Sequence, residues 1–398
     1  MTADARRQTQ RNGTTRSGSV VPRATGMPRR SGTEGHRADA GTAPGDARSV
    51  DVPTPSAAAA TMRAAWCPRY GGPESLEIRE LPRPAPAAGE LLVRVHVSAV
   101  TAADTMIRRG TPFYGRAFLG FVRPRHPIPG TGFAGTVEAL GEGVTNVEVG
   151  TAVFGETTLG FSANAEYLTV PADGVVLPKP GALSFEEAAV ACDGAMTALC
   201  LMEDTAKLRS GERLLVVGAA GAQGSAAVQI GERLGAHVTA VASAANAEFV
   251  ASLGAHAVID YGTVDFAATG ERWDVIYDTV GARRFSEARV ALTEGGRYVS
   301  GVLSLGLLAG TLWSARVGRR RALFAATGLR PAGELRERLG RVADMIVEGQ
   351  LRLPIERRYP LAAIADAHRH VEGGHKRGNL VIEMLDRAER DAGVGADS

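Results

Sequence analysis

Short apolar runs alternate with stretches of helical spacing through the second half of the chain. RLLVVG, HVTAVA, HAVID, WDVIYDTVG and GRYVSG are brief and almost continuously apolar, which is typical of strands buried on both faces of a parallel sheet. Each run is separated from the next by sequence of helical character. The alternation predicts a doubly wound α/β domain of the Rossmann type over residues 184–349.

The preceding residues have a different pattern. LLVRVHVSAV alternates residue types and is rich in β-branched side chains, and glycine interrupts PIPGTGFAGTVEALGEGVTNVEVGTAVFG every few positions. These features predict a compact, glycine-rich, mostly β domain over residues 62–183. Near the end of the chain, the pattern of residues 350–386 indicates strand, helix and strand, and we expect this segment to complete the first domain.

The first 60 residues contain no Leu, Ile, Phe, Tyr or Trp. Such a segment cannot bury enough apolar surface to offset the entropy lost on ordering. We therefore expect residues 1–61 to be a disordered tail. A start codon assigned upstream of a true start near Met62 explains this composition equally well.

Charge and cysteine content exclude several classes of protein. Lys and Arg number 45 against 43 Asp and Glu, and the excess of positive charge lies in the tail. A near-neutral body argues against nucleic-acid binding. Three cysteines without a C-x-x-C pair exclude a disulfide scaffold and suit a reducing compartment, so we predict a cytoplasmic protein.

One strongly apolar run, from Val302 to Trp313, is followed by Arg316, Arg319, Arg320 and Arg321. It is too short to span a bilayer, which needs about 20 apolar residues. We expect a core or dimer-interface segment, with contact to a lipid surface or to an apolar substrate as the alternative. We predict no membrane span, and a homodimer.

The strongest chemical signal is a glycine-rich turn between a strand and a helix. The turn comprises Gly218, Ala219, Ala220, Gly221, Ala222, Gln223 and Gly224. Glycine at position 221 lets the backbone approach a pyrophosphate, and glycine at position 224 lets the helix pack close to the strand. The helix start adds N–H donors and a positive dipole. This context predicts dinucleotide binding, whereas a glycine turn that merely closes a strand–helix connection is the alternative.

The choice between cofactors depends on the residue after the next strand, about 20 positions later. An acid there would bind the ribose hydroxyl of NADH, but this chain has Ser243, followed by Ala244, Ala245 and Asn246. A serine hydroxyl can donate to a 2′-phosphate and does not repel it. The sequence therefore favours NADPH over NADH.

From Met62 to Leu385 the chain resembles the zinc-independent medium-chain dehydrogenases/reductases, of the quinone oxidoreductase (zeta-crystallin-like) and enoyl reductase type. The matching blocks are VRVHVSAVTAADTMIRRG, PGTGFAGTVEALGEGVTNVEVGTAVFG, VVGAAGAQG with ASLGAHAVIDY, and VIYDTVG with EGGRYVSG. The resemblance implies a GroES-like fold for the β domain. It also implies a cofactor-binding place for Thr197 near the nicotinamide, for Tyr261 near the adenosine phosphate and for Asn379, where lysine is more usual.

Zinc alcohol dehydrogenases of the same superfamily carry a cysteine ligand in the first block and a G-H-E in the second. Here Thr101, Thr131 and Gly132 occupy those positions, and Cys192 or Asp193 lies near the third ligand position. One ligand alone cannot hold a four-coordinate zinc ion, so we expect no metal. Without a Lewis acid, a simple carbonyl or alcohol is a poor substrate, whereas a quinone or an α,β-unsaturated carbonyl accepts hydride readily.

Stabilisation of the developing enolate oxygen needs one or two donors. The family usually has Asn where this chain has Thr101, and often Tyr where it has Met106. Thr101 can still donate through its hydroxyl, and Tyr114 or Arg109 lies near enough in sequence to be a substitute, so Thr101 and Tyr114 are the candidate catalytic residues. We expect Asp104 to fix its loop through internal hydrogen bonds, and Arg108 and Arg109 to lie on a solvated face. The aromatic loop between Gly110 and Pro129 is either a lid over a flat substrate or a dimer or surface loop.

The sequence thus predicts an NADPH-dependent oxidoreductase acting on a small-molecule quinone or enone. Two alternatives stay open. One is an enoyl-thioester reductase of a biosynthetic pathway, and the other is a non-catalytic NADPH-binding sensor or interaction protein, made credible by the missing Asn and Tyr.

Overall fold

The computed structural model describes residues 60–384. The predicted tail lies outside these residues except for its last two positions, of which Thr61 begins the first strand. No helix within 60–384 is long and apolar enough to cross a membrane.

A six-stranded, all-parallel sheet forms in the second half of the chain, in the order β10-β9-β8-β11-β12-β13. Its strands are β8 (Arg213–Val217), β9 (His237–Ala242), β10 (Ala257–Asp260), β11 (Trp273–Asp278), β12 (Leu292–Ser300) and β13 (Arg321–Phe324). The chain winds outward from β8 in one direction and continues from β11 in the other, so the order reverses between β8 and β11. This confirms the predicted doubly wound α/β fold, whose ligand crevice lies at such a reversal.

A second, mixed sheet has the order β14-β15-β3-β4-β5-β7, with β6 also paired to β3. Its strands are β3 (Glu90–Val100), β4 (Gly132–Leu140), β5 (Ala152–Glu156), β6 (Tyr167–Pro171), β7 (Val175–Pro178), β14 (Ile355–Pro360) and β15 (Asn379–Glu383). Strands β1 (Thr61–Trp66) and β2 (Glu77–Pro82) form a separate antiparallel pair. The glycine-rich region is thus mostly β, and the end of the chain adds two strands to its sheet.

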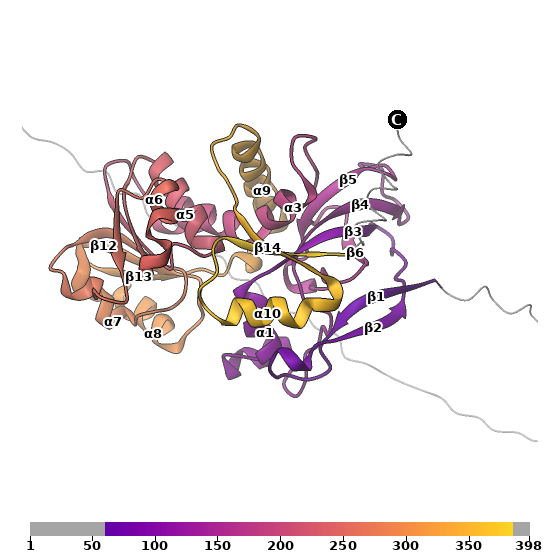
Figure 1. Cartoon of the computed structure of the whole chain (residues 1–398), viewed down its shortest axis with the longest axis horizontal. Coiled ribbons are helices and arrows are strands. Elements are labelled where there is room, and N and C mark those ends of the chain that lie inside the picture. The colour runs from indigo at the N-terminus through magenta and orange to yellow at the C-terminus, as the bar shows by residue number, and fades with distance from the viewer. Residues whose placement is uncertain (1–59, 385–398) are drawn as a thin grey trace, which may run out of the picture. The chain divides into compact units, whose positions relative to one another are not determined.

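Helices connect and cover the strands. They are α1 (Ala102–Arg109), α2 (Arg116–Leu119), α3 (Phe185–Val190), α4 (Met196–Leu199), α5 (Ala222–Arg233), α6 (Ala247–Ser252), α7 (Phe285–Ala288), α8 (Leu305–Ser314), α9 (Ala332–Val347) and α10 (Ile364–Glu372). Two π-helical segments, η4 (Ala191–Ala195) and η5 (Cys200–Ala206), join with α3 and α4 into one helical run. Figure 1 shows α10, from the end of the chain, beside α1 from its beginning.

Short 3₁₀ turns complete the described secondary structure. They are η1 (Pro73–Ser75), η2 (Phe113–Gly115), η3 (Thr158–Gly160), η6 (Ala244–Asn246), η7 (Phe266–Ala268), η8 (Arg289–Ala291), η9 (Thr327–Leu329) and η10 (Leu361–Ala363).

One large buried cluster joins the two sheets. It contains Phe154 from the mixed sheet, Val216 and Val275 from the parallel sheet, and Met196 from the helical run between them. Continuous apolar packing of this kind resists relative movement of the elements it contacts. The helical run that follows Ser184 therefore holds its polar residues in a fixed place between the two sheets.

Candidate cofactor and active site

The glycine-rich turn follows β8 at the reversal of strand order. Gly218 has a left-handed backbone with φ of +77°, and Gly221 N donates to its carbonyl oxygen at 3.1 Å. Gly221 is the N-cap of the twelve-residue helix α5, and no side chain of the described residues caps that helix start. The first N–H groups of α5 are therefore left for an external acceptor, and the helix dipole favours an anion there.

The two glycines predicted to matter differ in their surroundings. A Cβ at Gly224 would lie 2.1 Å from the Gly218 carbonyl oxygen and 2.7 Å from Ala219 Cα, so only glycine allows this close packing of helix and strand. A Cβ at Gly221 would meet no atom nearer than 3.6 Å. The backbone at Gly221 thus faces open space, which fits the close approach of a phosphate.

The rest of the turn is held by the parallel sheet and by the helical run. Ala219 N donates to Val241 O at 3.1 Å, and Tyr277 Oη donates to Gln223 Oε1 at 3.1 Å. A Cβ on Gly194, within η4, would lie 3.0 Å from the carbonyl carbon of Ala222. The turn is consequently in direct contact with the segment that carries Asp193 and Thr197.

Arg377 lies beside the segment that follows β9. Its Nε donates to Asn246 Oδ1 at 2.5 Å, and its NH2 donates to Ala245 O at 2.6 Å. Ser243, the residue predicted to discriminate between the cofactors, is the N-cap of the 3₁₀ turn η6 that contains these partners. The Arg377 guanidinium therefore binds the 3₁₀ turn that Ser243 begins, although no basic residue is close to Ser243 in the sequence.

Tyr261 and Asn379, which the family resemblance also implies to be cofactor-binding residues, each have a partner within the described residues. Tyr261 Oη is 3.5 Å from His375 Nδ1, and the Tyr261 side chain is exposed. Asn379 is buried, and its Nδ2 donates to Pro354 O at 3.2 Å. The Asp260 carboxylate accepts N–H bonds from Ala244 at 3.2 Å and from Gly262 at 3.0 Å, so its charge is turned towards backbone amides.

Lys376 approaches the glycine-rich turn from the other sheet. Its Nζ donates to Gly378 O at 2.7 Å, and Gly378 N donates to Ala220 O at 2.7 Å. Burial lowers the pKa of Lys376 to about 8, although Asp193 and Glu356 oppose this shift. A cation that is partly desolvated beside an uncapped helix start is well placed to meet a pyrophosphate.

Thr101 and Asp104 form a reciprocal cap at the start of α1. Thr101 N and Oγ1 donate to Asp104 Oδ2 at 2.8 and 2.9 Å, and Asp104 N donates back to Thr101 Oγ1 at 3.2 Å. This arrangement confirms that Asp104 fixes its loop by internal hydrogen bonds. Burial, reinforced by the nearby Asp193, raises the pKa of Asp104 to about 7.

Two more carboxyl groups lie near this cap. Glu156, at the end of β5, pairs in register with Gly132 of β4, and burial together with Asp193 and Asp104 raises its pKa to about 8. Burial also raises the pKa of Asp193, whereas Lys376 and the Thr101 hydroxyl oppose that shift. Near neutral pH this cluster therefore retains protons on groups that would be ionised in water.

The remaining predicted residues come from two other elements. Thr197 is on α4, one helical turn after Asp193, and is buried. Tyr114 is in the 3₁₀ turn η2, and its Oη donates to the carbonyl oxygen of Leu303 at 3.3 Å. The structure thus brings Thr101 to the buried carboxyl groups, and directs Tyr114 to the segment after β12.

Arg108 does not lie on a solvated face, as the sequence led us to expect. Its side chain is fully buried, with NH1 donating to Gly71 O at 2.7 Å, Nε to His368 Nδ1 at 3.3 Å, and NH2 to Glu372. The physical reason is that α10 packs on α1 and brings two partners for the guanidinium. Arg109, one position further, is 57% exposed as predicted.

The positions that hold zinc in related alcohol dehydrogenases do not offer a zinc-binding set here. Gly132 has no side chain, and a Cβ there would be 2.9 Å from Ala189 O. Within residues 60–384, no three His, Cys, Asp or Glu side chains are grouped so that they could hold a metal ion. Thr101 and Asp193 alone do not make a four-coordinate site.

Comparison with known proteins places the chain in a family. Residues 87–181 match the family described as alcohol dehydrogenase GroES-like domain, and residues 253–382 match the family described as zinc-binding dehydrogenase. The pig quinone oxidoreductase (Sus scrofa) is 32% identical over 240 residues, which cover 58% of this chain and 70% of that protein. A chloroplast envelope quinone oxidoreductase homolog of Arabidopsis thaliana is 29% identical over 79% of this chain and 95% of that protein.

Solved structures agree with these relatives. The quinone oxidoreductase from Coxiella burnetii superposes with a TM-score of 0.74 at 28% identity, covering 82% of this chain and all of that one. The CurK enoyl reductase superposes with a TM-score of 0.71 at 25% identity, covering 81% of this chain and 99% of that one. The chain belongs to the medium-chain dehydrogenase/reductase family, of the quinone oxidoreductase and enoyl reductase type, and is an oxidoreductase whose fold fits a nicotinamide cofactor.

Proposed function

We propose that this protein is an NADPH-dependent oxidoreductase that transfers hydride to a quinone or an α,β-unsaturated carbonyl without zinc. The observation that carries the choice of NADPH is the position of Arg377, whose guanidinium binds Asn246 and Ala245 beside Ser243. A guanidinium and a hydroxyl suit a 2′-phosphate, and the residue position that would carry an NADH-binding acid carries Ser243 instead. A mycobacterial protein solved in complex with NADPH is 28% identical to this chain, with a TM-score of 0.68.

The residues that would hold the cofactor extend from the turn after β8 to the segment after α10. The glycine-rich turn binds the pyrophosphate in this proposal, and Lys376 is the cation beside it. The residues of the turn that would bind it are Gly218, Ala219, Gly221, Ala222, Gln223 and Gly224. Ser243, Asn246, Tyr261 and Arg377 form the adenosine end, and Thr197 and Asn379 lie towards the nicotinamide in this proposal. The reduced nicotinamide supplies a hydride when it is bound.

The acceptor follows from the donor set around Thr101. The chain offers hydroxyl and carboxyl groups at this place rather than a zinc-binding set, so a substrate that is already electron-poor suits it best. The Thr101 hydroxyl donates to Asp104 in the ground state. A protonated Asp104 carboxyl group is a weaker acceptor than the carboxylate. The Thr101 hydroxyl can then donate its hydrogen bond to a developing enolate oxygen instead of to Asp104.

We propose Glu156, which lies opposite Gly132 in the sheet and beside the carboxyl groups of Asp104 and Asp193, as the source of the proton that completes the reduction. Its buried carboxyl group has a pKa of about 8 and so holds a proton at neutral pH. Tyr114, bound to Leu303, is proposed as a second donor on the opposite side of the substrate. We further propose, as the sequence predicted, that the protein is cytoplasmic and forms a homodimer.

An enoyl-thioester reductase is the second candidate, because the CurK enoyl reductase is among the structures that superpose well on this chain. Both reactions add hydride to a conjugated system and require the same cofactor residues. They differ in the acceptor, since a thioester brings an acyl chain and a carrier arm.

The test is a steady-state assay of NADPH oxidation by the full chain. Quinones, simple enones and crotonyl thioesters are compared as acceptors, and bound zinc is measured on the same sample. We expect turnover with quinones or enones and less than a tenth of an equivalent of zinc. Faster turnover with thioesters would favour the second candidate, whereas NADPH binding without turnover on any acceptor would favour a sensor and overturn the proposal.

A further inference from the structure

Two stretches of the chain contain no acidic residue. Residues 105–137 and 295–333 together carry eleven Arg and neither Asp nor Glu. The two stretches meet in the folded protein, because Tyr114 Oη donates to Leu303 O at 3.3 Å. A protein with nearly balanced charge overall therefore concentrates basic residues in two segments that are in contact.

The same stretches expose many large apolar side chains. Of the 17 large hydrophobic residues that are exposed within residues 60–384, nine lie in these two stretches. They are Phe113, Phe118, Phe121, Val122, Leu305, Leu312, Trp313, Val317 and Leu329. Phe118 and Val122 are more than 80% exposed, which is unusual for such side chains on the surface of a monomer.

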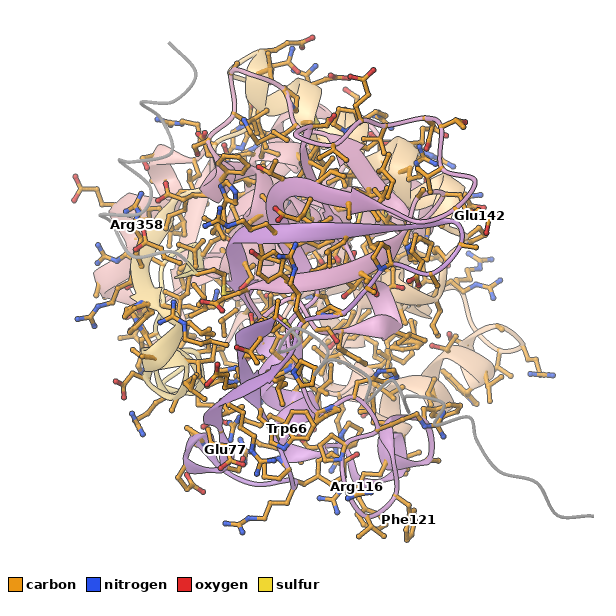
Figure 2. The ribbon with its side chains drawn as sticks, turned by 90° about the vertical axis from the view of Figure 1, so that its right-hand side faces the viewer. Trp66, Glu77, Arg116, Phe121, Glu142 and Arg358 are labelled. Atoms are coloured by element: carbon orange, nitrogen blue, oxygen red, sulfur yellow. The ribbon has the colours of Figure 1, made fainter. Side chains whose placement is uncertain are left out.

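We call the loop Thr111–His126, together with α8 and the following turn to Arg321, the arginine–apolar surface. Figure 2 shows Arg116 and Phe121 on neighbouring parts of this loop at the lower edge of the molecule, with Phe121 pointing outward. In Figure 1, α8 lies on the lower side of the parallel sheet. The exposed side chains of α8 include Leu305, Leu312 and Trp313.

Most arginines of this surface have no carboxylate partner. Arg319 pairs with Glu294, which is the exception. Arg116, Arg123, Arg125, Arg316, Arg320 and Arg321 form no ion pair with any described residue, although Arg116 stacks on the Tyr70 ring at 4.3 Å. The positive charge of this surface is consequently not cancelled within the described part of the chain.

We propose that the arginine–apolar surface docks on an anionic lipid bilayer. Phe, Leu and Trp side chains insert at the level of the lipid headgroups, and arginines bind the phosphates around them. A second copy of this surface fits less well, because residues 111–126 and 305–321 contain neither Asp nor Glu to pair with the arginines of the other copy. A nucleic acid would satisfy the arginines but would leave the apolar side chains in water. This inference does not depend on the proposed reaction.

The experiment is flotation of the full chain with lipid vesicles. Vesicles of equal parts phosphatidylglycerol and phosphatidylcholine are compared with vesicles of phosphatidylcholine alone. The triple variant Phe118→Ser/Phe121→Ser/Val122→Ser removes the most exposed apolar side chains, and Arg123→Ser/Arg125→Ser removes two unpaired charges. The matched control is Val149→Ser/Val264→Ser, because these two valines are also exposed but lie outside both stretches. Thermal unfolding confirms that each variant folds.

We expect the wild type to bind the anionic vesicles and to bind neutral ones at least tenfold more weakly. The triple and the double variants should each lose about tenfold in partitioning, and the control should bind as the wild type does. Equal binding by the wild type and the triple variant would mean that another basic segment, such as the tail, binds the lipid, and would overturn the proposal. Absence of vesicle binding, with a dimer in sedimentation that the triple variant converts to monomer, would assign the surface to a second copy instead.

Discussion

Arg377 Nε donates to Asn246 Oδ1 at 2.5 Å, although the two residues are 131 positions apart in the chain. The contact joins the segment after α10, which leads into the mixed sheet, to the segment after β9 of the parallel sheet. One side chain thereby connects the two sheets at the place where the adenosine end of the cofactor is proposed to bind. In the proposed function, the choice of cofactor therefore depends on the tertiary contact between Arg377 and Asn246 and not on one loop alone.

Replacement of Arg377 should separate the two cofactors. In Arg377→Met we expect NADPH affinity to fall about tenfold or more, because a charge-assisted hydrogen bond to the 2′-phosphate is lost. NADH affinity should stay within about twofold. Fluorescence titration with each cofactor measures both. Ser243→Asp should shift the preference in the same direction by repulsion, and an equal loss for both cofactors in Arg377→Met would contradict the role given to this residue.

Substitution of Gly224 and of Gly221 in the glycine-rich turn should have different effects, the first on stability and the second on NADPH affinity. Gly224→Ala forces a methyl group to within 2.1 Å of the Gly218 carbonyl oxygen and should lower the free energy of unfolding by about 1–3 kcal/mol. Gly221→Ala meets no such clash and has a backbone that alanine accepts, so it should fold normally and lose about tenfold in NADPH affinity.

Urea denaturation and a cofactor titration on both glycine variants check this pair. If Gly221→Ala bound NADPH as tightly as the wild type, the open space beside residue 221 would not be the phosphate site.

Stability should depend on pH through Glu156. Its pKa is about 8 in the folded protein, against an ordinary value of 4.5, so the folded state binds the proton more tightly. The resulting stabilisation is complete below about pH 4.5 and is lost as pH rises towards 8, at about 1.4 kcal/mol per pH unit. In Glu156→Gln this part of the slope should disappear.

The measurement is the free energy of unfolding of the wild type and of Glu156→Gln between pH 5 and pH 8. Asp104 and His368 also titrate abnormally, so the difference between the two proteins is used, which contains the titration of Glu156 together with its coupling to Asp104. Glu142→Gln, at an exposed position shown in Figure 2, serves as the control. Parallel curves for the wild type and Glu156→Gln would show that the Glu156 carboxyl is not buried as described.

Arg108 and its neighbour Arg109 provide a matched test of burial. Arg108→Met leaves Glu372 and the Gly71 carbonyl without their donor and should cost about 3 kcal/mol of folding free energy. Arg109→Met, on the exposed side of the same helix, should change stability by less than about 0.5 kcal/mol. Chemical denaturation checks both variants, and equal effects would contradict the buried network between α1 and α10.

The sequence predicted those features that depend on local pattern. The apolar runs around Val216 and Val275 give the parallel strands, and the glycines after β8 give the turn that begins α5. It could not predict the environment of Arg377, because the proximity of that residue to Ser243 depends on how the end of the chain returns to the parallel sheet. Arg108 and Arg109 are adjacent and chemically identical, so only the packing of α10 decides which one is buried.

The carboxyl cluster was missed for a similar reason. Asp104, Glu156 and Asp193 come from α1, β5 and η4, and nothing in their spacing indicates that they affect one another's pKa. The departures at Thr101, Thr131 and Gly132 indicated only that this place differs from that of the zinc enzymes.

The most direct test of the central claim is calorimetric titration of the folded, full-length chain with NADPH and with NADH. The account predicts binding of NADPH and at least tenfold weaker binding of NADH. The reason is that the Arg377 guanidinium and the Ser243 hydroxyl are the proposed partners of the 2′-phosphate. Absence of heat with either reduced nucleotide, or a clear preference for NADH, would contradict it.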